Sequence, residues 1–303
     1  MNLTPVCLVT GFLGSGKTTF LRQLTEQYRD RRLVYLINEF SSTDIDGRRL
    51  SLPSDRLLSI VGGSIFCRCL VTEFIEVLRA ARTFFAGDVE GVVIEASGIA
   101  DPSVFGRLLE ETQLDQVYAL ALCVTLVDPA TLGKVLRTLP NAQAQVESAD
   151  VVLLNKTDLH TEESLARAEM EIRTLNTHAR LIRTRHARAE VDIFTQSVRP
   201  ALQGEYATCR DPGFCTSTAH PPGPIVWGKL REALVLLGDV LCRAKGFLLC
   251  DDGWRYVDWV AGEWTEEPAA SSGTSELVLI GHAESAQRLQ RLRQRIEAGT
   301  FCR

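Results

Sequence analysis

The chain has 303 residues, enough for one large domain or two ordinary ones, and 45% of them are apolar while 23% are charged. This composition is typical of a folded globular protein and excludes collagen, coiled coil and extensive disorder. The formal net charge of −5 argues against general nucleic-acid binding, because neutralising phosphates requires a surplus of cations.

Short apolar runs alternate with helical patterns along the first two thirds of the chain. Strand-like runs occupy Val6–Val9, Leu33–Ile37, Gly91–Ile94, Ala119–Val127 and Val151–Leu154. A helix is predicted at Thr18–Tyr28, and another by the i, i+3, i+4, i+7 spacing of Val71, Phe74, Ile75 and Leu78. Because the strands are continuously apolar, we expect parallel strands buried on both faces. The pattern predicts an α/β fold with a mostly parallel, doubly wound sheet over residues 1–202.

The composition changes near residue 203. Residues 203–224 are rich in Gly, Pro, Ser and Thr and are predicted to be a linker. Beyond it the pattern predicts a helix at Lys229–Leu237, strands at Gly246–Cys250, Trp254–Val260 and Leu277–Ile280, and a last helix at Glu284–Ile296. We therefore expect residues 225–303 to form a smaller α+β domain.

The last predicted helix is basic. Arg288, Arg291, Arg293 and Arg295 lie opposite an apolar stripe of Leu289, Leu292 and Ile296. A solvated helix face explains this arrangement, and a docking surface for a client protein or RNA is the alternative.

Residues 11–18 read Gly-Phe-Leu-Gly-Ser-Gly-Lys-Thr and match the pattern G-x-x-x-x-G-K-[ST] between a strand and a helix. Glycines let such a loop curl so that backbone N–H groups point at phosphate oxygens, and the helix N-terminus adds its positive end. We expect Lys17 to bridge the β- and γ-phosphates of a nucleotide and Thr18 to bind Mg²⁺. The predicted phosphate-binding residues are Gly11, Gly14, Ser15, Gly16, Lys17, Thr18 and Thr19.

Two further motifs follow predicted strands. Asn155-Lys156-Thr157-Asp158 looks like the N-K-x-D guanine motif, in which the aspartate accepts a donor pair that adenine lacks, so it favours GTP. Glu95 stands where a Walker B carboxylate would hold a Mg²⁺-bound water, and the Gly98 N–H is placed to sense the γ-phosphate. Lys17, Glu95 and Gly98 are the predicted catalytic residues. The residue that orients the water stays open among Glu39, Asp44 and Asp46.

Together these motifs resemble the CobW-type metallochaperone GTPases, within the wider CobW, HypB and UreG group. The matching segments are residues 11–19, Asn38-Glu39-Phe40, residues 62–69 with Cys67-Arg68-Cys69, residues 95–102, Asn155–Asp158 and Arg243-x-Lys245-Gly246. The resemblance covers nearly the whole chain. It implies GTP hydrolysis, slow without a partner, coupled to delivery of Zn²⁺, Co²⁺ or a related metal to a metalloprotein client.

The family's metal motif is Cys-x-Cys-Cys, whereas this chain reads Cys67-Arg68-Cys69-Leu70. Zn²⁺ normally takes at least three protein ligands, so the two thiols need help from Glu39, a histidine, or a second protomer in a nucleotide- or metal-dependent homodimer. Either the pair forms a weaker metal site, which suits a carrier, or the site is degenerate. The alternative function is accordingly a GTPase switch that gates assembly of a client enzyme without carrying metal. A small-molecule kinase is a third hypothesis, which the guanine motif disfavours.

The nine cysteines do not show the dense spacing of a secreted disulfide framework, and the N-terminus lacks a basic signal-peptide segment. No apolar run approaches the roughly 20 residues of a membrane helix. We therefore expect a cytoplasmic protein with reduced thiols and no membrane partner. Cys7 and Cys123 lie in apolar strands and are expected to be core residues.

Overall fold

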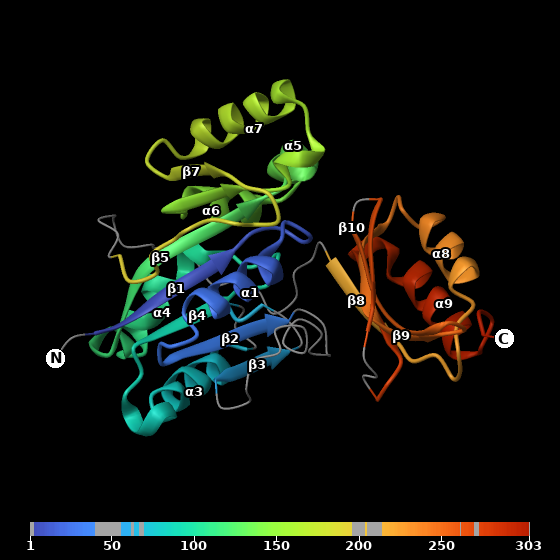
Figure 1. The fold of residues 1–303 in the computed structure, drawn as a ribbon, viewed down its shortest axis with the longest axis horizontal. Helices are drawn as coiled ribbons and strands as arrows, with labels where there is room; N and C mark the ends of the chain where they lie inside the picture. The colour runs from blue at the N-terminus through green and yellow to red at the C-terminus, as the bar shows by residue number, and fades with distance from the viewer. Residues whose placement is uncertain are drawn as a thin grey trace. The chain divides into compact units, whose positions relative to one another are not determined.

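The computed structural model describes residues 3–39, 56–61, 64–66, 70–195, 204, 214–260, 262–269 and 273–302. The described residues divide into two compact units, one made of residues up to 204 and the other of residues from 214 onward (Figure 1). Within the described ranges, no helix combines the length and the apolar character needed to span a membrane.

The N-terminal unit is built on a seven-stranded sheet in which every described strand pair is parallel. Across the sheet the strands are β3 (Leu57–Val61), β2 (Leu33–Glu39), β4 (Gly91–Glu95), β1 (Thr4–Thr10), β5 (Tyr118–Val127), β6 (Val151–Leu154) and β7 (Arg180–Arg183). Because all strands run the same way, the loops that follow β1, β4, β5 and β6 meet at one edge of the sheet, where α/β proteins place their ligand sites.

Helices cover both faces of this sheet, because successive residues of a strand point to opposite sides. Val6 and Leu8 of β1 pack with α3 (Val71–Ala81) and α4 (Phe105–Glu111), whereas Cys7 and Val9 pack with α1 (Lys17–Gln27). A further core cluster joins β6 to α5 (Pro129–Thr138), α6 (Pro140–Glu147) and α7 (Glu162–Leu175). Short 3₁₀ helices lie at Phe84–Gly87, Pro102–Val104, Leu114–Gln116, Thr157–Leu159 and Ala283–Ser285. The predicted doubly wound α/β fold is confirmed.

The C-terminal unit contains an antiparallel five-stranded sheet. Its strands lie in the order β11 (Glu263–Pro268), β10 (Gly253–Val260), β9 (Leu241–Cys250), β12 (Glu276–His282) and β8 (Phe214–Ala219). Helices α8 (Trp227–Val235) and α9 (Ala286–Glu297) lie on one side of it (Figure 1). Their buried residues Leu230, Leu234, Leu289, Leu292 and Ile296 share one core cluster with the sheet, which confirms the apolar stripe predicted for the last helix.

Strand β8 lies inside the stretch that was predicted to be a linker. Its residues pair antiparallel with β12 from Leu277↔Ala219 to His282↔Phe214, and Ala219 is buried in the core cluster. The linker prediction is therefore wrong for residues 214–219. The sequence Cys-Thr-Ser-Thr reads as polar loop, but β-branched threonines suit an edge strand whose outer face is solvated.

The Arg243-x-Lys245-Gly246 segment forms the centre of β9. The Arg243 guanidinium donates hydrogen bonds of 2.9 and 2.7 Å to the two carboxylate oxygens of Asp258 on β10. Lys245 is completely buried. At Gly246 a Cβ would collide with the backbone carbonyl of Glu276 on β12. These residues hold the centre of the small sheet together.

This close approach predicts opposite effects for alanine at two glycines. Gly246→Ala should lower the free energy of unfolding by about 1–3 kcal/mol, because β9 and β12 must move apart. Gly228→Ala should instead raise it by about 0.4–1 kcal/mol, because the position is helical with open space around it. Urea unfolding of both variants measures the two changes, and destabilisation of the same size in both would contradict the packing argument.

Candidate functional site

The loop between β1 and α1 can be built only from glycine at three positions. Gly11, Gly14 and Gly16 have φ angles of 133°, 76° and 109°, values that side-chain-bearing residues rarely adopt. Neighbouring elements also leave no room, since a Cβ at Gly11 would collide with the Leu126 carbonyl of β5 and one at Gly16 with the Asn155 amide. The loop is thus curled tightly against β5 and the end of β6.

Lys17 begins helix α1 and lies inside this loop. It is only 6% exposed, and its ammonium group donates a 2.8 Å hydrogen bond to the carbonyl of Gly11. Thr18 is also buried, whereas Thr19 is half-buried. The buried hydroxyl of Ser15 has no hydrogen-bond partner among the described residues. A buried cation at a helix N-terminus, surrounded by curled backbone, is the arrangement that binds phosphate.

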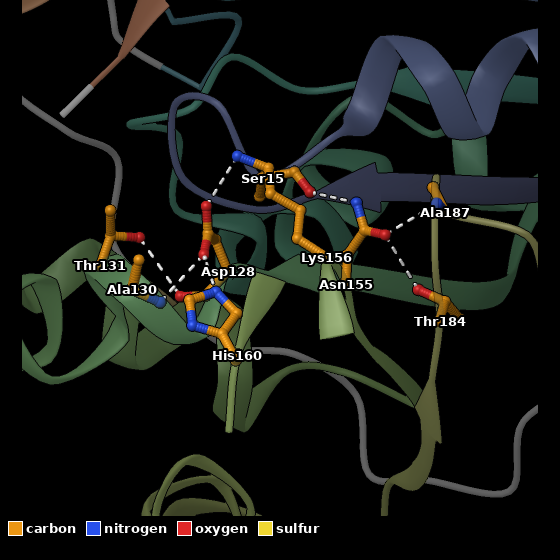
Figure 2. A network of polar contacts seen from close by, with 9 residues as sticks. All are labelled: Ser15, Asp128, Ala130, Thr131, Asn155, Lys156, His160, Thr184 and Ala187. Atoms are coloured by element: carbon orange, nitrogen blue, oxygen red, sulfur yellow. Dashed lines mark hydrogen bonds and ion pairs between the residues drawn. The ribbon is translucent and has the colours of Figure 1, made fainter. Parts of the chain in front are cut away.

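Asn155 ties three chain segments together (Figure 2). Its Nδ2 donates a 2.9 Å hydrogen bond to the carbonyl of Ser15 in the glycine loop. Its Oδ1 accepts hydrogen bonds from the backbone N–H of Ala187 at 2.7 Å and from the hydroxyl of Thr184 at 3.2 Å. The side chain itself is 2% exposed. One buried carboxamide therefore fixes the distance between the glycine loop, the end of β6 and the segment after β7.

The next residue, Lys156, is held by a carboxylate that the motifs did not indicate. Its Nζ lies 2.7 Å from Oδ2 of Asp128, and His160 Nε2 lies 3.5 Å from Oδ1 of the same side chain (Figure 2). Asp128 also accepts a hydrogen bond from the Ala130 N–H and so caps α5. The available sequence signal was Asp128-Pro129 after an apolar strand, which is typical of an N-cap followed by proline at the first helical position.

Asp158 has a different environment from its neighbours. It lies in the 3₁₀ helix Thr157–Leu159 and is exposed to solvent. Within the part of the chain that the structure describes, its side chain forms no hydrogen bond or ion pair, so the carboxylate is accessible to a ligand.

Glu95 and Gly98 lie where the chain leaves β4. The Glu95 side chain is 3% exposed. A Cβ on Gly98 would come within 2.8 Å of the backbone nitrogen of Leu13, so this residue touches the glycine loop directly. From the other side, Gln145 on α6 donates hydrogen bonds to the carbonyls of Gly98 at 3.2 Å and Ala100 at 2.9 Å. The segment after β4 is thus held between the glycine loop and α6.

The donors near this segment fit Mg²⁺. Glu95 is the last residue of β4, Thr18 lies in the helix that follows the adjacent parallel strand β1, and both residues are buried. A hydroxyl and a carboxylate are the hard oxygen ligands that Mg²⁺ prefers. A buried carboxylate is also costly unless cations or hydrogen-bond donors compensate its charge.

Asn38, near the end of β2, connects two loops. It is 4% exposed, and its Oδ1 accepts hydrogen bonds from the backbone N–H groups of Ile65 at 3.0 Å and Ser97 at 3.2 Å. Its Nδ2 donates to the carbonyl of Ile60 on β3 at 3.3 Å. This one buried side chain therefore links Ile65, which lies two residues before Cys67, to the segment after β4.

The predicted transition-metal ligands are not described by the structure. Cys67, Cys69 and the side chain of Glu39 lie outside the described residues, as do Asp44 and Asp46. Among the residues that are described, no group of three or more His, Cys, Asp or Glu side chains is arranged to hold a metal ion. Leu70, at the position of the family's third thiol, is the N-cap of α3 and packs against the core.

Three of the described cysteines in strands, Cys7, Cys123 and Cys250, are buried core residues. Cys7 and Cys123 are 1% and 0% exposed, as predicted, and burial raises the pKa of Cys7 far above its usual range. Burial likewise raises the pKa of Cys250 to about 11. Since the thiolate is the metal-binding form, neither Cys7 nor Cys250 is suited to that role at neutral pH.

The parallel sheet, the curled glycine loop at the start of α1 and the Asn155 bridge define a P-loop nucleotide-binding protein. The family model described as "CobW/HypB/UreG, nucleotide-binding domain" matches residues 5–183, which is more than half of the chain. The model "Cobalamin synthesis protein cobW C-terminal domain" matches residues 214–296. The chain belongs to the CobW/HypB/UreG family.

Two curated relatives are similar to this chain over about half of their own length. The Pseudomonas aeruginosa protein named zinc chaperone CobW is 31% identical over 201 residues, which cover 55% of this chain and 52% of that protein. The Escherichia coli protein named zinc chaperone YjiA is 30% identical over 162 residues, covering 52% and 51%. The matched region thus spans about half the length of these relatives. The crystal structure of Zn(II)-bound YjiA GTPase from E. coli aligns over 98% of this chain and 100% of that one, with 20% identity and a TM-score of 0.48.

The Asn155 bridge predicts a stability effect. Asn155→Ala should lower the free energy of unfolding by about 1–3 kcal/mol, because it leaves the buried Ala187 N–H and Ser15 carbonyl without their partner. Thr174→Ala is the matched control, since its hydroxyl bonds only the Met170 carbonyl on the exposed side of α7, and it should change stability by no more than about 0.5 kcal/mol. Urea unfolding compares the two, and equal losses would contradict a bridging role for Asn155.

Proposed function

We propose that the protein binds and hydrolyses GTP and acts as a metallochaperone or metal-insertion factor that delivers Zn²⁺, Co²⁺ or a related metal to a metalloprotein client in the cytoplasm. The observation that carries the proposal is the gathering of the glycine loop, Glu95 and the Asn155–Asp158 motif at one edge of the sheet. Membership of the CobW/HypB/UreG family and relatives named zinc chaperones support the metal part.

In the proposed reaction, a water oxygen attacks the γ-phosphorus while the bond to the β,γ-bridging oxygen breaks, giving GDP and phosphate. Lys17 and the loop N–H groups stabilise the negative charge of the transferring group. Thr18 and Glu95 hold the Mg²⁺ site, and the ion, when bound, neutralises charge on the phosphate oxygens. Gly98, packed against the glycine loop, reports through its N–H whether the γ-phosphate is present.

Guanine selectivity is assigned to Asp158. An exposed carboxylate beside the Asn155 bridge is available to accept the N1–H and the exocyclic amine of guanine, and adenine would leave it unpaired. Lys156, held by Asp128, braces the same end of the nucleotide.

The hydrogen bonds of Asn38 couple nucleotide binding to metal binding in this proposal. Losing the γ-phosphate changes the contacts of residues 97 and 98, and Asn38 shares one oxygen between the Ser97 and Ile65 N–H groups. Cys67 and Cys69 follow Ile65 in the chain. A change in either loop therefore alters the hydrogen bond to the other, which gives nucleotide and metal a common element.

Nucleotide titration tests the GTPase proposal. The protein should bind fluorescent GTP more tightly than fluorescent ATP, and Asp158→Asn should weaken GTP binding by about ten- to hundredfold, because a charge-assisted hydrogen-bond pair is lost. Asp115→Asn is the matched control, since Asp115 is also an exposed aspartate in a 3₁₀ helix and should leave affinity unchanged. A preference for ATP would refute the proposal.

Metal titration distinguishes a carrier from a switch that gates enzyme assembly without cargo. The affinity for Zn²⁺ and Co²⁺, measured by competition with a chromogenic chelator, should differ between the GTP-analogue and GDP states and fall by roughly tenfold or more in Cys67→Ser and Cys69→Ser, because each loses a thiolate ligand. Metal binding that is absent, or indifferent to both nucleotide and thiols, would leave the gating switch as the function.

Two variants of Asn38 test the coupling in the same assay. Asn38→Ala should reduce the nucleotide dependence of metal affinity, because both shared N–H bonds are lost. Asn38→Asp keeps the acceptor oxygen but loses the donor to the Ile60 carbonyl, and should retain part of the dependence. GTP affinity and the thermal midpoint serve as controls for folding. If Asn38→Ala preserves the full nucleotide dependence, the bridge is structural only.

A further inference from the structure

Helices α8 and α9 of the C-terminal domain leave a groove of about 520 Å³ between them. Each helix lines it with one stripe at i, i+3, i+4 and i+7 spacing, beginning at Lys229 on α8 and at Arg288 on α9. These stripes adjoin the core-facing ones, and every residue that lines the groove belongs to the C-terminal unit.

The floor and one rim of the groove are apolar. Leu292 and Phe301 are 3% exposed each and contribute their groove-facing atoms to its floor. Leu236, which caps the C-terminal end of α8, lines the rim and is 79% exposed. Single exposed leucines are common on protein surfaces. Leu236, however, lines the groove between α8 and α9, which is large enough to hold a ligand. An exposed apolar surface in a groove is typical of an interaction site.

The polar lining carries an excess of positive charge. The groove is lined by four cationic side chains and by one carboxylate, that of Glu232. The cations are Lys229, Arg288, Arg291 and Arg295. Asp239 pairs with Arg288 in two hydrogen bonds of 2.8 and 3.2 Å. Within the described ranges, Lys229 and Arg291 have no carboxylate at ion-pair distance. In a chain whose net charge is −5, this groove is locally basic.

We propose that the groove binds a short acidic segment of a partner protein. Apolar side chains of that segment enter between α8 and α9 against Leu236 and Leu292, and its carboxylates pair with Lys229 and Arg291. Charge complementarity sets the sign of the partner, and the apolar floor requires side chains that can be buried. RNA fits less well, because a phosphate backbone offers nothing to cover an exposed leucine. Binding of such a segment goes beyond the GTPase and metal functions proposed above, and it uses only residues of the C-terminal unit.

The test uses the full chain and short fluorescein-labelled peptides measured by anisotropy. One peptide set combines Leu and Phe with Asp and Glu, a second replaces the acids by Lys, a third replaces the apolar residues by Ser, and a short single-stranded RNA is the fourth probe. The first set should bind roughly tenfold or more tightly than each of the others. Its affinity should fall as the salt concentration rises, because exposed charges are screened.

Variants then place the binding in the groove. Arg291→Glu and Leu236→Ser should each weaken binding of the first set by roughly tenfold, whereas Arg167→Glu, an exposed arginine on α7, should not. All three should keep the wild-type thermal midpoint and GTP hydrolysis rate, which separates this proposal from the proposed function. Equal affinity for acidic and basic peptides, tighter binding of RNA, no binding of any peptide, or binding unchanged by both groove variants would each overturn it.

Discussion

The arrangement of the site depends on the hydrogen bonds of the Asn155 carboxamide. This carboxamide is the point where the glycine loop after β1, the end of β6 and the segment after β7 share hydrogen bonds. These segments are far apart in the chain, and only the parallel sheet brings them to the same edge. The Asn155 amide lies so close to residue 16 that no Cβ fits there. The hydrogen bonds of Asn155 therefore require glycine at this position.

Much of the fold was predictable because the central strands are continuously apolar. Strands β1, β2, β4, β5 and β6 were all indicated by such runs, and they form the buried middle of the sheet. The missed strands lie at edges or are polar. β7 is four residues long with an arginine at each end, and β8 is rich in Ser and Thr. Edge strands bury less apolar surface, and the sequences of β7 and β8 therefore differ little from those of loops.

The local motifs of the site were predictable for a related reason. A glycine loop and an N-K-x-D segment carry their chemistry in adjacent residues, so one stretch of sequence reveals them. The supporting contacts were not predictable, because they join distant residues: Asp128 holds Lys156, and Gln145 holds the backbone of residues 98 and 100. Asn38 belonged to a recognised segment, but its hydrogen bonds to Ile65 and Ser97 required coordinates.

Among the residues that the structure describes, the core of the C-terminal unit has no member in common with the clusters of the N-terminal unit. Its buried members begin at Ala219. The three clusters around the parallel sheet contain no residue beyond Phe194. Substitutions inside the core of one unit therefore place no packing demand on the core of the other. Over evolutionary time, each unit of such a chain is free to repack its interior while the other keeps its own.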